Sequence, residues 1–488
     1  MTLNGVMFQA FTWQSRGTDD QPFWQLLAGR ASDLKQAGFT SVWMPPACKG
    51  AGGAEDVGYG IYDLFDLGDF DQKGSAPTRW GTAEQFGECC KTLEETGLSP
   101  LFDAVLNHKI GADETETFAV VEVDPNDRNT DVGEPRDIEA WTRFTYPVRA
   151  GQHSEFEWNF QHYTGLEQAD DHDDSHLYRL ATKGFNPNVG EENGNSDYLL
   201  GCDVDLTNDD VRDELIRWGR WLTDHYAVAG FRFDAAKHMN SEFITSFLDD
   251  LRGRSGKELF SVCEFATADM DSLCAFIDRT EGKVTAFDFP LHHRMVSASR
   301  DAAGFDLCTL FDDTLLQCAP EQAVTFVENH DTAPSKGAGH DDAVDDWFKP
   351  IAYAAILLRQ AGYPCVFAGD YDADGDGEHT GTHGRSDLGN LIDRLLEIRR
   401  DYAFGEQLDT PIDRHVCAWQ RLGTEDHAGR LITLASIGDG GQATLDTGRP
   451  NERFANLLDP DADPVEADDN GRATFPYPPG GIAIYASA

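Results

Sequence analysis

The sequence predicts an α/β fold: a (β/α)₈ TIM barrel with an inserted irregular β subdomain after strand 3 and a C-terminal antiparallel β-sandwich. Three features of the chain lead to this prediction. Short apolar runs that end in polar residues alternate with amphipathic helical patterns. One gap between two such runs is about 120 residues long, far beyond an ordinary strand-to-helix connection. After residue 403 the pattern changes to short strands between Gly- and Asp-rich turns.

Eight apolar runs have the length and composition of buried strands. Strands that alternate with helices pair in parallel, and eight of them close into a barrel. The runs are residues 5–13, 39–46, 98–108, 228–238, 258–265, 284–291, 323–331 and 363–371.

Helical patterns lie between most of these runs. Residues 21–38 carry apolar side chains at helical spacing and end at Gly38, a residue suited to a helix C-terminus. Asn208 is a suitable N-cap for a helix over 208–222. Residues 346–362 and 386–402 follow the same pattern. We interpret all of these apolar stripes as core.

The long connection and the terminal change of pattern divide the chain into four segments. We expect a first part of the barrel over 1–106, an inserted subdomain over 107–206, a second part of the barrel over 207–402 and the β-sandwich over 403–488. The insertion is rich in Asp, Asn, Gly and aromatic residues, which favours irregular β structure.

The charge balance excludes some classes of partner. The chain has 86 acidic and 39 basic residues, a formal net charge of −47, and the carboxylates are dispersed over every segment. Nucleic acids and anionic membranes both require basic patches, so we expect neither as a partner. Dispersed acidity with few lysines is typical of proteins adapted to molar salt, where self-repulsion is screened. We also expect a monomer.

The cysteines and the apolar runs indicate a location. The ten cysteines show no zinc-like pairs, and most lie in apolar runs, where a thiol behaves as a small buried hydrophobe. The first residues, "MTLNGVMFQAFTW", lack a charged-then-apolar leader, and no apolar run is long enough to span a membrane. We therefore expect a cytoplasmic protein.

The stretch "GFRFDAAKH" (230–238) places charged residues inside an apolar strand. Side chains alternate along a strand, so Phe231 and Phe233 face one way, and Arg232 and Asp234 share the other face. Taken alone, the pair is either a structural ion pair or a functional one. Functional residues of a barrel cluster at the C-terminal ends of its strands.

Three carboxylates, Asp234, Glu264 and Asp331, follow different predicted strands and are expected to meet at the mouth of the barrel. Two such carboxylates suit glycoside hydrolysis, in which one attacks the anomeric carbon and the other protonates the leaving oxygen. Arg232 would keep Asp234 ionised, whereas Glu264, flanked by apolar residues and near like charges, is the better candidate acid.

These residues also carry a family resemblance. "DAVLNH", "GFRFDAAKH", the glutamate of "VCEF" and "FVENHD" resemble, in order, the four main motifs of the α-amylase family, glycoside hydrolase family 13. "DYLLGCDVDL" resembles the fifth motif, and "FQAFTWQ", "VWMPPACKG" and "DVGYGIYDLFDLGDFDQKG" resemble the liquefying bacterial α-amylases. The resemblance covers nearly the whole chain.

The resemblance implies a role for each matching residue. Asp234 would be the nucleophile, Glu264 the general acid/base and Asp331 the stabiliser of the transition state. The residues implied to contact the sugars are Tyr59, His108, Arg232, Lys237, His238 and His330.

The resemblance further implies a structural calcium ion. Its ligands would be Asn107, Asp197, Asp203 and the backbone carbonyl of His238, and hard oxygen ligands suit Ca²⁺. A second ion at Asp205 is in doubt, because Thr207 stands where a further carboxylate is expected. The loop 372–383 begins like a calcium-binding loop but ends in His383, so we interpret it as an acidic loop.

The leading functional hypothesis is a retaining, endo-acting hydrolase of α-1,4-glucosidic bonds in starch, glycogen or maltodextrins. A maltooligosaccharide-acting exo-hydrolase or transglycosylase of the same family is the alternative, and products distinguish the two. A non-catalytic sugar-binding relative is a third possibility. Such relatives typically lose one of the three carboxylates, all of which are present here.

Overall fold

The computed structural model describes residues 4–18, 20–169, 175–334, 342–373 and 384–487. The chain forms two compact units. One comprises residues 1–14, 33–40 and 288–488, and the other comprises residues 15–32 and 41–287.

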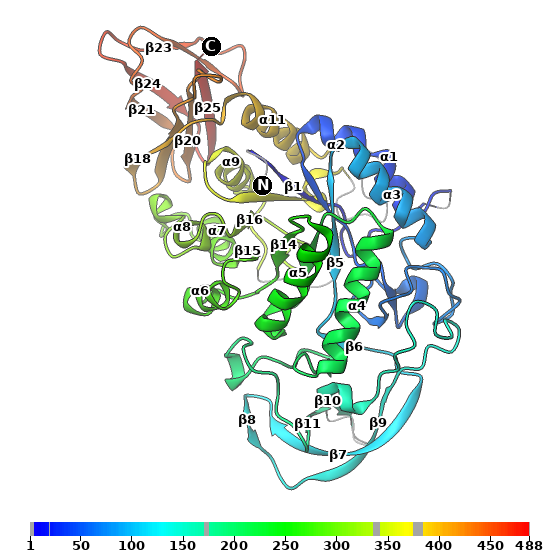
Figure 1. The fold of residues 1–488 in the computed structure, drawn as a ribbon. Helices are drawn as coiled ribbons and strands as arrows, with labels where there is room; N and C mark the ends of the chain where they lie inside the picture. Colours follow the sequence, from blue (N-terminus) through cyan, green and yellow to red (C-terminus); the bar gives the residue numbers. More distant parts are fainter. Residues whose placement is uncertain (1–3, 19, 170–174, 335–341, 374–383, 488) are drawn as a thin grey trace. The chain divides into compact units, whose positions relative to one another are not determined.

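Among the described residues, eight strands form a closed barrel in the order β1-β17-β16-β15-β14-β13-β5-β2. Figure 1 labels five of them, β1, β5, β14, β15 and β16. Each predicted run contains one of the eight strands, so the predicted barrel is confirmed. The strands are shorter than the runs, because most of the remaining residues of the runs lie in loops or, in 284–291 and 363–371, in the helices that follow. The eight strands are β1 Met7–Gln9, β2 Ser41–Trp43, β5 Ser99–Ala104, β13 Gly230–Phe233, β14 Phe260–Cys263, β15 Thr285–Phe287, β16 Ala323–Phe326 and β17 Tyr363–Phe367.

The predicted helices form, with one break. The pattern over 21–38 gives two helices, α1 (Phe23–Gly29) and α2 (Ala31–Ala37), which are separated at Arg30. Asn208 caps α4 as predicted, and its side chain accepts a hydrogen bond from the backbone N–H of Asp210. The other α-helices are α3 Ala83–Thr96, α4 Asp209–His225, α5 Ser241–Ser255, α6 Met270–Arg279, α7 Phe289–Arg300, α8 Leu315–Cys318, α9 Lys349–Leu358, α10 Ala368–Tyr371 and α11 Asp387–Tyr402.

The outer faces of β5 and β13 pack against α4 and α5. Phe102 of β5 contacts Trp218 of α4, with ring centroids 5.6 Å apart. Phe231 and Phe233 of β13 both contact Phe247 of α5, at 5.5 and 5.9 Å. The two phenylalanines therefore share the helix-facing side of β13, which confirms the predicted alternation in "GFRFDAAKH".

The insertion contains an antiparallel sheet in the order β6-β12-β10-β11-β7-β8, with β9 paired to β7. Phe118, Leu166 and Tyr178 belong to its buried apolar cluster. The strands are β6 His108–Lys109, β7 Glu114–Asp124, β8 Asp127–Asp131, β9 Arg136–Arg143, β10 Tyr163–Ala169, β11 Ser175–Leu180 and β12 Cys202–Val204; a separate pair joins β3 Lys49–Gly50 to β4 Ile61–Asp63.

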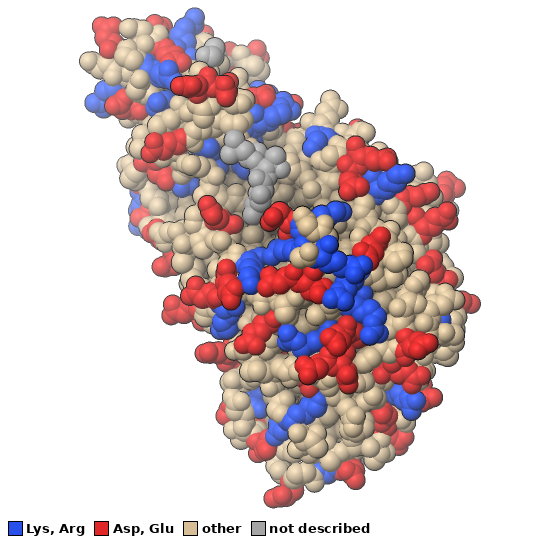
Figure 2. Space-filling view, viewed as in Figure 1, with Lys and Arg blue, Asp and Glu red and all other residues tan. Residues whose placement is uncertain are grey.

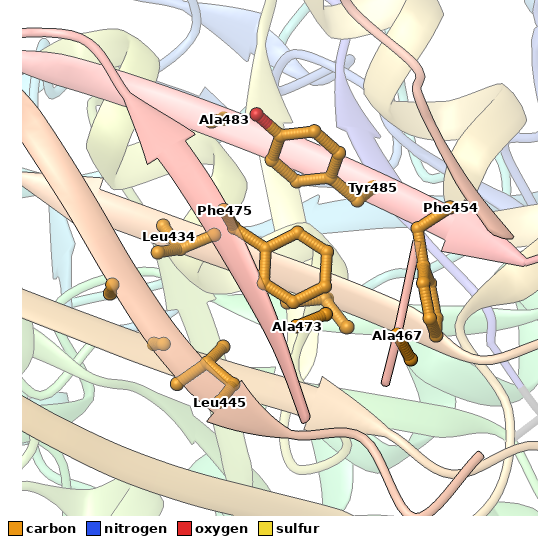
Figure 3. Close-up of a cluster of buried hydrophobic side chains, with 11 residues drawn as sticks. Leu434, Leu445, Phe454, Ala467, Ala473, Phe475, Ala483 and Tyr485 are labelled. Atoms are coloured by element: carbon orange, nitrogen blue, oxygen red, sulfur yellow. The ribbon is translucent and has the colours of Figure 1, made fainter. Parts of the chain in front are cut away.

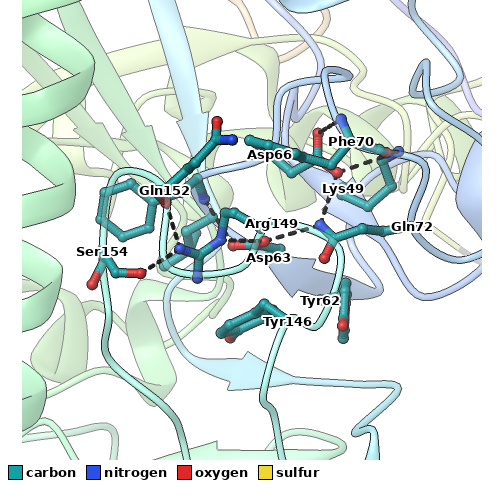
Figure 4. Close-up of polar contacts among 12 residues, drawn as sticks. Lys49, Tyr62, Asp63, Asp66, Phe70, Gln72, Tyr146, Arg149, Gln152 and Ser154 are labelled. Carbon is teal, nitrogen blue, oxygen red and sulfur yellow. Dashed lines mark hydrogen bonds and ion pairs between the residues drawn. The ribbon is translucent and has the colours of Figure 1, made fainter.

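A buried polar network fixes the segment that follows β9 (Figure 4). Arg149 donates from Nε to Asp63 Oδ2 at 2.8 Å and from Nη1 to the carbonyls of Gln152 and Ser154. Gln72 donates from Nε2 to both Asp63 and Asp66, each at 3.0 Å. The network ties the end of β4 to the insertion.

The C-terminal region consists of two antiparallel sheets. One has the order β18-β19-β20-β25-β22-β23, and the other pairs β21 with β24. Leu445 and Phe475 from the smaller sheet lie in one apolar cluster with Leu434, Phe454 and Tyr485 from the larger sheet (Figure 3). The strands are β18 Gln407–Asp413, β19 Val416–Arg421, β20 Leu431–Ser436, β21 Gly441–Asp446, β22 Arg453–Asn456, β23 Val465–Glu466, β24 Arg472–Tyr477 and β25 Gly481–Ser487.

Acidic residues are spread over the whole of the face shown in Figure 2, with Lys and Arg interspersed among them. In the part of the chain that the structure describes, no helix combines the length and the apolar composition needed to cross a membrane.

Candidate active site

Four ionisable residues meet where three adjacent barrel strands end. β13 pairs in parallel with β5 on one side and with β14 on the other. Arg232 of β13 donates from Nη1 to Asp103 Oδ1 at 2.8 Å and to Asp234 Oδ1 at 2.6 Å. Its Nη2 lies 2.8 Å from Glu264 Oε2. One guanidinium therefore holds three carboxyl groups that come from three strands.

Arg232 is fully buried. Burial alone would lower the pKa of its guanidinium, but the surrounding Asp103, Glu264, Tyr59 and Asp234 raise that pKa well above its usual value. The guanidinium is thus a permanent positive charge in the middle of the carboxyl groups.

The expected contact between Arg232 and Asp234 is present, but Arg232 contacts Glu264 as well. Sequence reasoning assigned the cation to Asp234 and left Glu264 without one, whereas the same guanidinium contacts both. Strand pairing explains the difference, because it brings the end of β14 beside Arg232.

Asp103 is a site residue to which sequence reasoning gave no role. Its Oδ2 accepts hydrogen bonds from Trp43 Nε1 and from the Tyr59 hydroxyl, both at 2.9 Å. The Arg232 guanidinium lies over both rings, 4.9 Å from the centroid of Trp43 and 5.7 Å from that of Tyr59. Asp103 therefore fixes Tyr59, one of the predicted sugar-contacting residues, against Arg232. Asp103 is the first residue of the motif "DAVLNH", and this position was the feature of the sequence that could have identified it as a site residue.

The turn after β13 supplies a further donor to the site. Glu264 accepts a hydrogen bond at 2.8 Å from the backbone N–H of Ala235. Ala235 has a φ of 50°, in the left-handed region that non-glycine residues rarely adopt. In this backbone conformation the N–H of Ala235 points at the carboxylate of Glu264, which follows the neighbouring strand β14.

Two predicted histidines, the buried His108 and the half-buried His238, each contact a backbone carbonyl. His108 Nε2 lies 2.8 Å from the carbonyl of Tyr59, and burial lowers the pKa of His108 to about 4. His238 Nδ1 contacts the carbonyl of Ser196, and burial lowers its pKa to about 4 as well. A neutral imidazole that donates through one nitrogen presents a lone pair on the other.

Lys237 is already engaged by protein groups. Its Nζ donates to Glu192 Oε2 at 2.8 Å and to the carbonyl of Ala266 at 2.9 Å. A sugar that contacts Lys237 would share the ammonium with these two acceptors.

The predicted calcium ligands Asn107, Asp197 and Asp203 lie together and are buried. Asn107 Nδ2 is 3.4 Å from Asp203 Oδ1, and the Thr164 hydroxyl contacts both carboxylates. Burial raises the pKa of both acids, and Asp197 raises that of Asp203 further. Neither carboxylate has an ion pair in the described part of the chain, so these oxygen ligands fit a bound cation.

Two further observations concern the metal-binding groups of this region. No set of three or more His, Cys, Asp or Glu side chains arranged to hold a metal occurs among the described residues. Asp205, the candidate for a second ion, is bound by Lys183 Nζ at 2.6 Å and by Thr207. The loop 372–383 lies almost entirely outside the described residues.

His330 and Asp331 belong to the other unit and follow β16. His330 Nδ1 is 3.0 Å from Gln9 Nε2, and its ring lies 5.1 Å from the rings of Phe11 and Trp13. Asp331 lies 3.4 Å from His330 Nε2, and its side chain is 48% exposed. Trp13 lines a cavity of about 270 Å³ together with His330, Lys349 and Asp370.

A buried ion-pair network includes Glu328, two residues before His330. Lys349 Nζ is 2.7 Å from Asp370 and 4.0 Å from Glu328, and the Tyr353 hydroxyl donates to Asp370 at 2.7 Å. Glu328 also accepts a hydrogen bond from Thr332. Glu328 and Thr332 are the first and last residues of the "ENHDT" turn that carries His330 and Asp331, so their hydrogen bond closes this turn.

The barrel and its strand-end carboxylates define a glycoside hydrolase of the (β/α)₈ class. The family described as alpha amylase, catalytic domain, matches residues 195–379. The chain is 38% identical to an alpha-amylase of Geobacillus stearothermophilus over 99% of this chain and 87% of the relative. It is 36% identical to the cytoplasmic alpha-amylase of Escherichia coli, over 99% and 98%.

A third relative, the glucan 1,4-alpha-maltohexaosidase of Bacillus sp. strain 707, is 40% identical over 91% of this chain and 85% of its own. A crystal structure of an α-amylase from Geobacillus thermoleovorans has the same fold, with a TM-score of 0.67 at 15% identity over 100% of this chain and 98% of that one. The chain belongs to the α-amylase family.

Proposed function

We propose that the protein hydrolyses α-1,4-glucosidic bonds in starch, glycogen or maltodextrins, with retention of configuration and within the glucan chain. The observation that carries the proposal is the set of carboxyl groups around Arg232, in a chain whose relatives are named as amylases.

Charge balance at Arg232 supports distinct roles for the carboxyl groups. Asp103, Asp234 and Glu264 would carry a net charge of −2 with Arg232 if all were ionised, so protonation of one is favoured. Burial raises the pKa of Asp103, but Arg232, Trp43 and Tyr59 donate to both of its oxygens, so Asp103 is not placed to transfer a proton to a substrate. Glu264 is thus the proposed acid, and Asp234 the proposed nucleophile.

In the proposed reaction, the Asp234 carboxylate attacks the anomeric carbon while Glu264 transfers its proton to the leaving glycosidic oxygen. The resulting Glu264 carboxylate then takes a proton from water, whose oxygen attacks the same carbon and releases Asp234. Asp331 would stabilise the positive charge that develops on the sugar. This role is supported by the position of Asp331 in the turn that follows β16, a strand of the same barrel.

We assign sugar contacts to Tyr59, His108, Lys237, His238 and His330, and an indirect role to the fully buried Arg232. The fixed orientation of the Tyr59 ring over Arg232 supports a stacking role. His108 Nδ1 has no hydrogen-bond partner among the described residues, which leaves it as an acceptor once Nε2 donates to the Tyr59 carbonyl. Arg232 acts through the carboxyl groups it holds.

The experiment that tests this function compares wild type with Asp234→Asn on soluble starch. Loss of iodine staining together with mixed oligosaccharide products in the wild type, and neither in the variant, is the expected result. A defined short product released without loss of staining would contradict endo action. A folded wild type that is inert would contradict hydrolysis itself.

An exo-acting or transferring enzyme is the second candidate. The maltohexaosidase relative, at 40% identity, favours a preference for one product length. Chromatography of early products separates the two: a single oligosaccharide from the start of the reaction favours this candidate, and a broad distribution favours the first.

We further propose that calcium binds Asn107, Asp197, Asp203 and the backbone carbonyl of His238. The ion would neutralise two buried carboxylates and link the insertion to the turn after β13. Chelation should lower the stability of the wild type by about 3 kcal/mol, as expected for removal of a saturating ligand. Asp203→Asn should reduce that response. A melting temperature that chelators leave unchanged would contradict the site.

The remaining proposals concern the whole chain. We propose a cytoplasmic monomer adapted to high salt, with the divisions 1–106, 107–206, 207–402 and 403–488. The name of the Escherichia coli relative supports the location, and the dispersed net charge of −47 supports the adaptation.

A further inference from the structure

A cavity of about 660 Å³ lies where barrel strands begin, within the unit that contains the C-terminal region. Tyr363, the first residue of β17, lines it, and so does Glu321, two residues before β16 starts. His330 follows the opposite end of β16, so the cavity is at the end of that strand remote from His330 and Asp331.

Two buried arginines line this cavity, Arg399 from the end of α11 and Arg421 from the end of β19. Each is only 4% exposed. In a chain with 86 acidic residues, neither forms an ion pair within the described part of the chain. The pKa of each guanidinium is lowered to about 10, mainly by burial, with a smaller contribution from the charge of Arg421 for Arg399 and of Arg359 for Arg421.

Among the described residues, the side chains of both arginines donate only to carbonyl oxygens. Arg399 donates to the carbonyls of Asn4, Gly5 and Leu357. Arg421 donates from Nε and Nη2 to the carbonyl of Gly405, at 3.2 and 3.0 Å. Arg421 Nη1 is buried and has no partner among the described residues. Carbonyls supply no counter-charge, so two positive charges and one free donor remain uncompensated.

The other walls of the cavity offer polar and apolar contacts. Asn4 and Gln360 contribute amide groups, and Tyr363 and Phe404 contribute aromatic rings. Phe404 is stacked on His427, with ring centroids 3.6 Å apart. A cavity of this size accommodates a small organic molecule rather than a single ion.

We infer that this cavity binds a small organic molecule that carries a phosphate monoester, which Arg399 and Arg421 would neutralise. A phosphate monoester carries a charge of about −1.5 to −2 at neutral pH, matching two guanidinium groups, whereas a carboxylate matches one. Guanidinium groups are well suited to phosphate oxygens. The ligand would contact both the barrel, through Tyr363 and Arg399, and the C-terminal sheet, through Arg421.

The test uses phenyl phosphate, whose ring suits the Tyr363 and Phe404 wall, on the full-length protein. Binding is followed by calorimetry and by the melting temperature at constant ionic strength, with benzyl alcohol and phenylacetate as the neutral and carboxylate controls. We expect phenyl phosphate to bind and raise the melting temperature, benzyl alcohol to have no effect, and phenylacetate to bind more weakly.

Two variants locate the binding. Arg421→Gln should weaken phenyl phosphate binding by about tenfold or more, the effect of losing one charge-assisted contact. Glu321→Gln removes a carboxylate from the cavity wall at an exposed position, and should strengthen phenyl phosphate binding without disturbing folding. Arg220→Gln removes an exposed arginine elsewhere and should leave binding unchanged.

The outcomes distinguish this inference from a purely structural role of the arginines. Absence of phenyl phosphate binding, or binding that neither Arg421→Gln nor Glu321→Gln alters, would overturn it. Equal affinity for phenylacetate would overturn the assignment to phosphate. The assay requires no glucan, so its result is independent of the proposed hydrolysis.

Discussion

At the scale of single residues, Arg232 has the largest influence on the candidate site. Its two terminal nitrogens reach Asp103, Asp234 and Glu264, so the position of each carboxyl group depends on one planar side chain. A lysine ammonium is a compact charge on a flexible stem and lacks this fork.

We expect Arg232→Lys to lower kcat by about 100-fold or more, because preorganised contacts to the reacting carboxyl groups are lost while the charge remains. Steady-state kinetics on soluble starch measure the effect, with Arg220→Lys on the exterior as the matched control. A variant with wild-type kcat would show that the charge alone is sufficient.

His162 should make stability depend on pH. Its Nδ1 accepts a hydrogen bond from the backbone N–H of Asn159 at 3.1 Å, which requires an unprotonated nitrogen. Burial lowers its pKa from 6.5 to about 4. Since the folded pKa is the lower one, the unfolded chain binds the proton more readily, and stability falls as pH decreases from 6.5 to 4.

The shift of His162 corresponds to about 3 kcal/mol across that window. This pH-dependent loss of stability is measured by urea unfolding of the wild type and His162→Gln, at neutral pH and near pH 4. His225→Gln, at an exposed position, is the control. The expected result is a smaller loss of stability in His162→Gln than in wild type. Parallel losses in all three proteins would rule out this contribution.

At the scale of elements, buried ion pairs hold loops that hydrophobic contacts alone would leave undefined. Arg149 and Asp63 are each 1% exposed at their side chains and join the segment after β9 to the end of β4. The Arg149 guanidinium also lies 4.5 Å from the Tyr146 ring. Removal of either partner leaves a buried charge without compensation.

We expect Arg149→Met to destabilise the protein by about 3–5 kcal/mol, the cost of leaving Asp63 unpaired. Arg143→Met is the matched control, because Arg143 pairs with the exposed Glu114 and Glu157 and its loss should have a much smaller effect on stability. Equal effects of the two substitutions, measured by urea unfolding, would contradict the importance of burial.

At the scale of the whole molecule, the net charge of −47 opposes the compact state through self-repulsion. The screening length shortens from about 10 Å at 0.1 M salt to about 3 Å at 1 M salt. Repulsion between dispersed carboxylates should therefore decline steeply over this range.

We expect the melting temperature to rise as KCl increases from low to molar concentration. A series with sucrose at matched osmolality is the control for general exclusion of a cosolute from the protein surface. Sucrose should raise the melting temperature less than KCl does at the lowest concentrations, where charge screening by salt changes most. A melting temperature that does not respond to KCl would refute the proposed adaptation to salt.

The sequence by itself determined the barrel strands, the capped helix α4 and the alternation along β13. These features depend on local periodicity and capping, which a single stretch of chain records. It also placed Asp234 and Glu264 at strand ends, because parallel strands in a barrel present the same end to one side.

Only the tertiary structure decided which groups each of these residues contacts. Arg232 contacts Glu264 as well as Asp234 because β13 and β14 pair in register, and Asp103 enters the site because β5 lies on the other side of β13. The tertiary structure also pairs Asp205 with Lys183. It brings Arg399 and Arg421, from different elements, into one cavity. Such contacts depend on three-dimensional proximity, which the periodicity of one segment does not record.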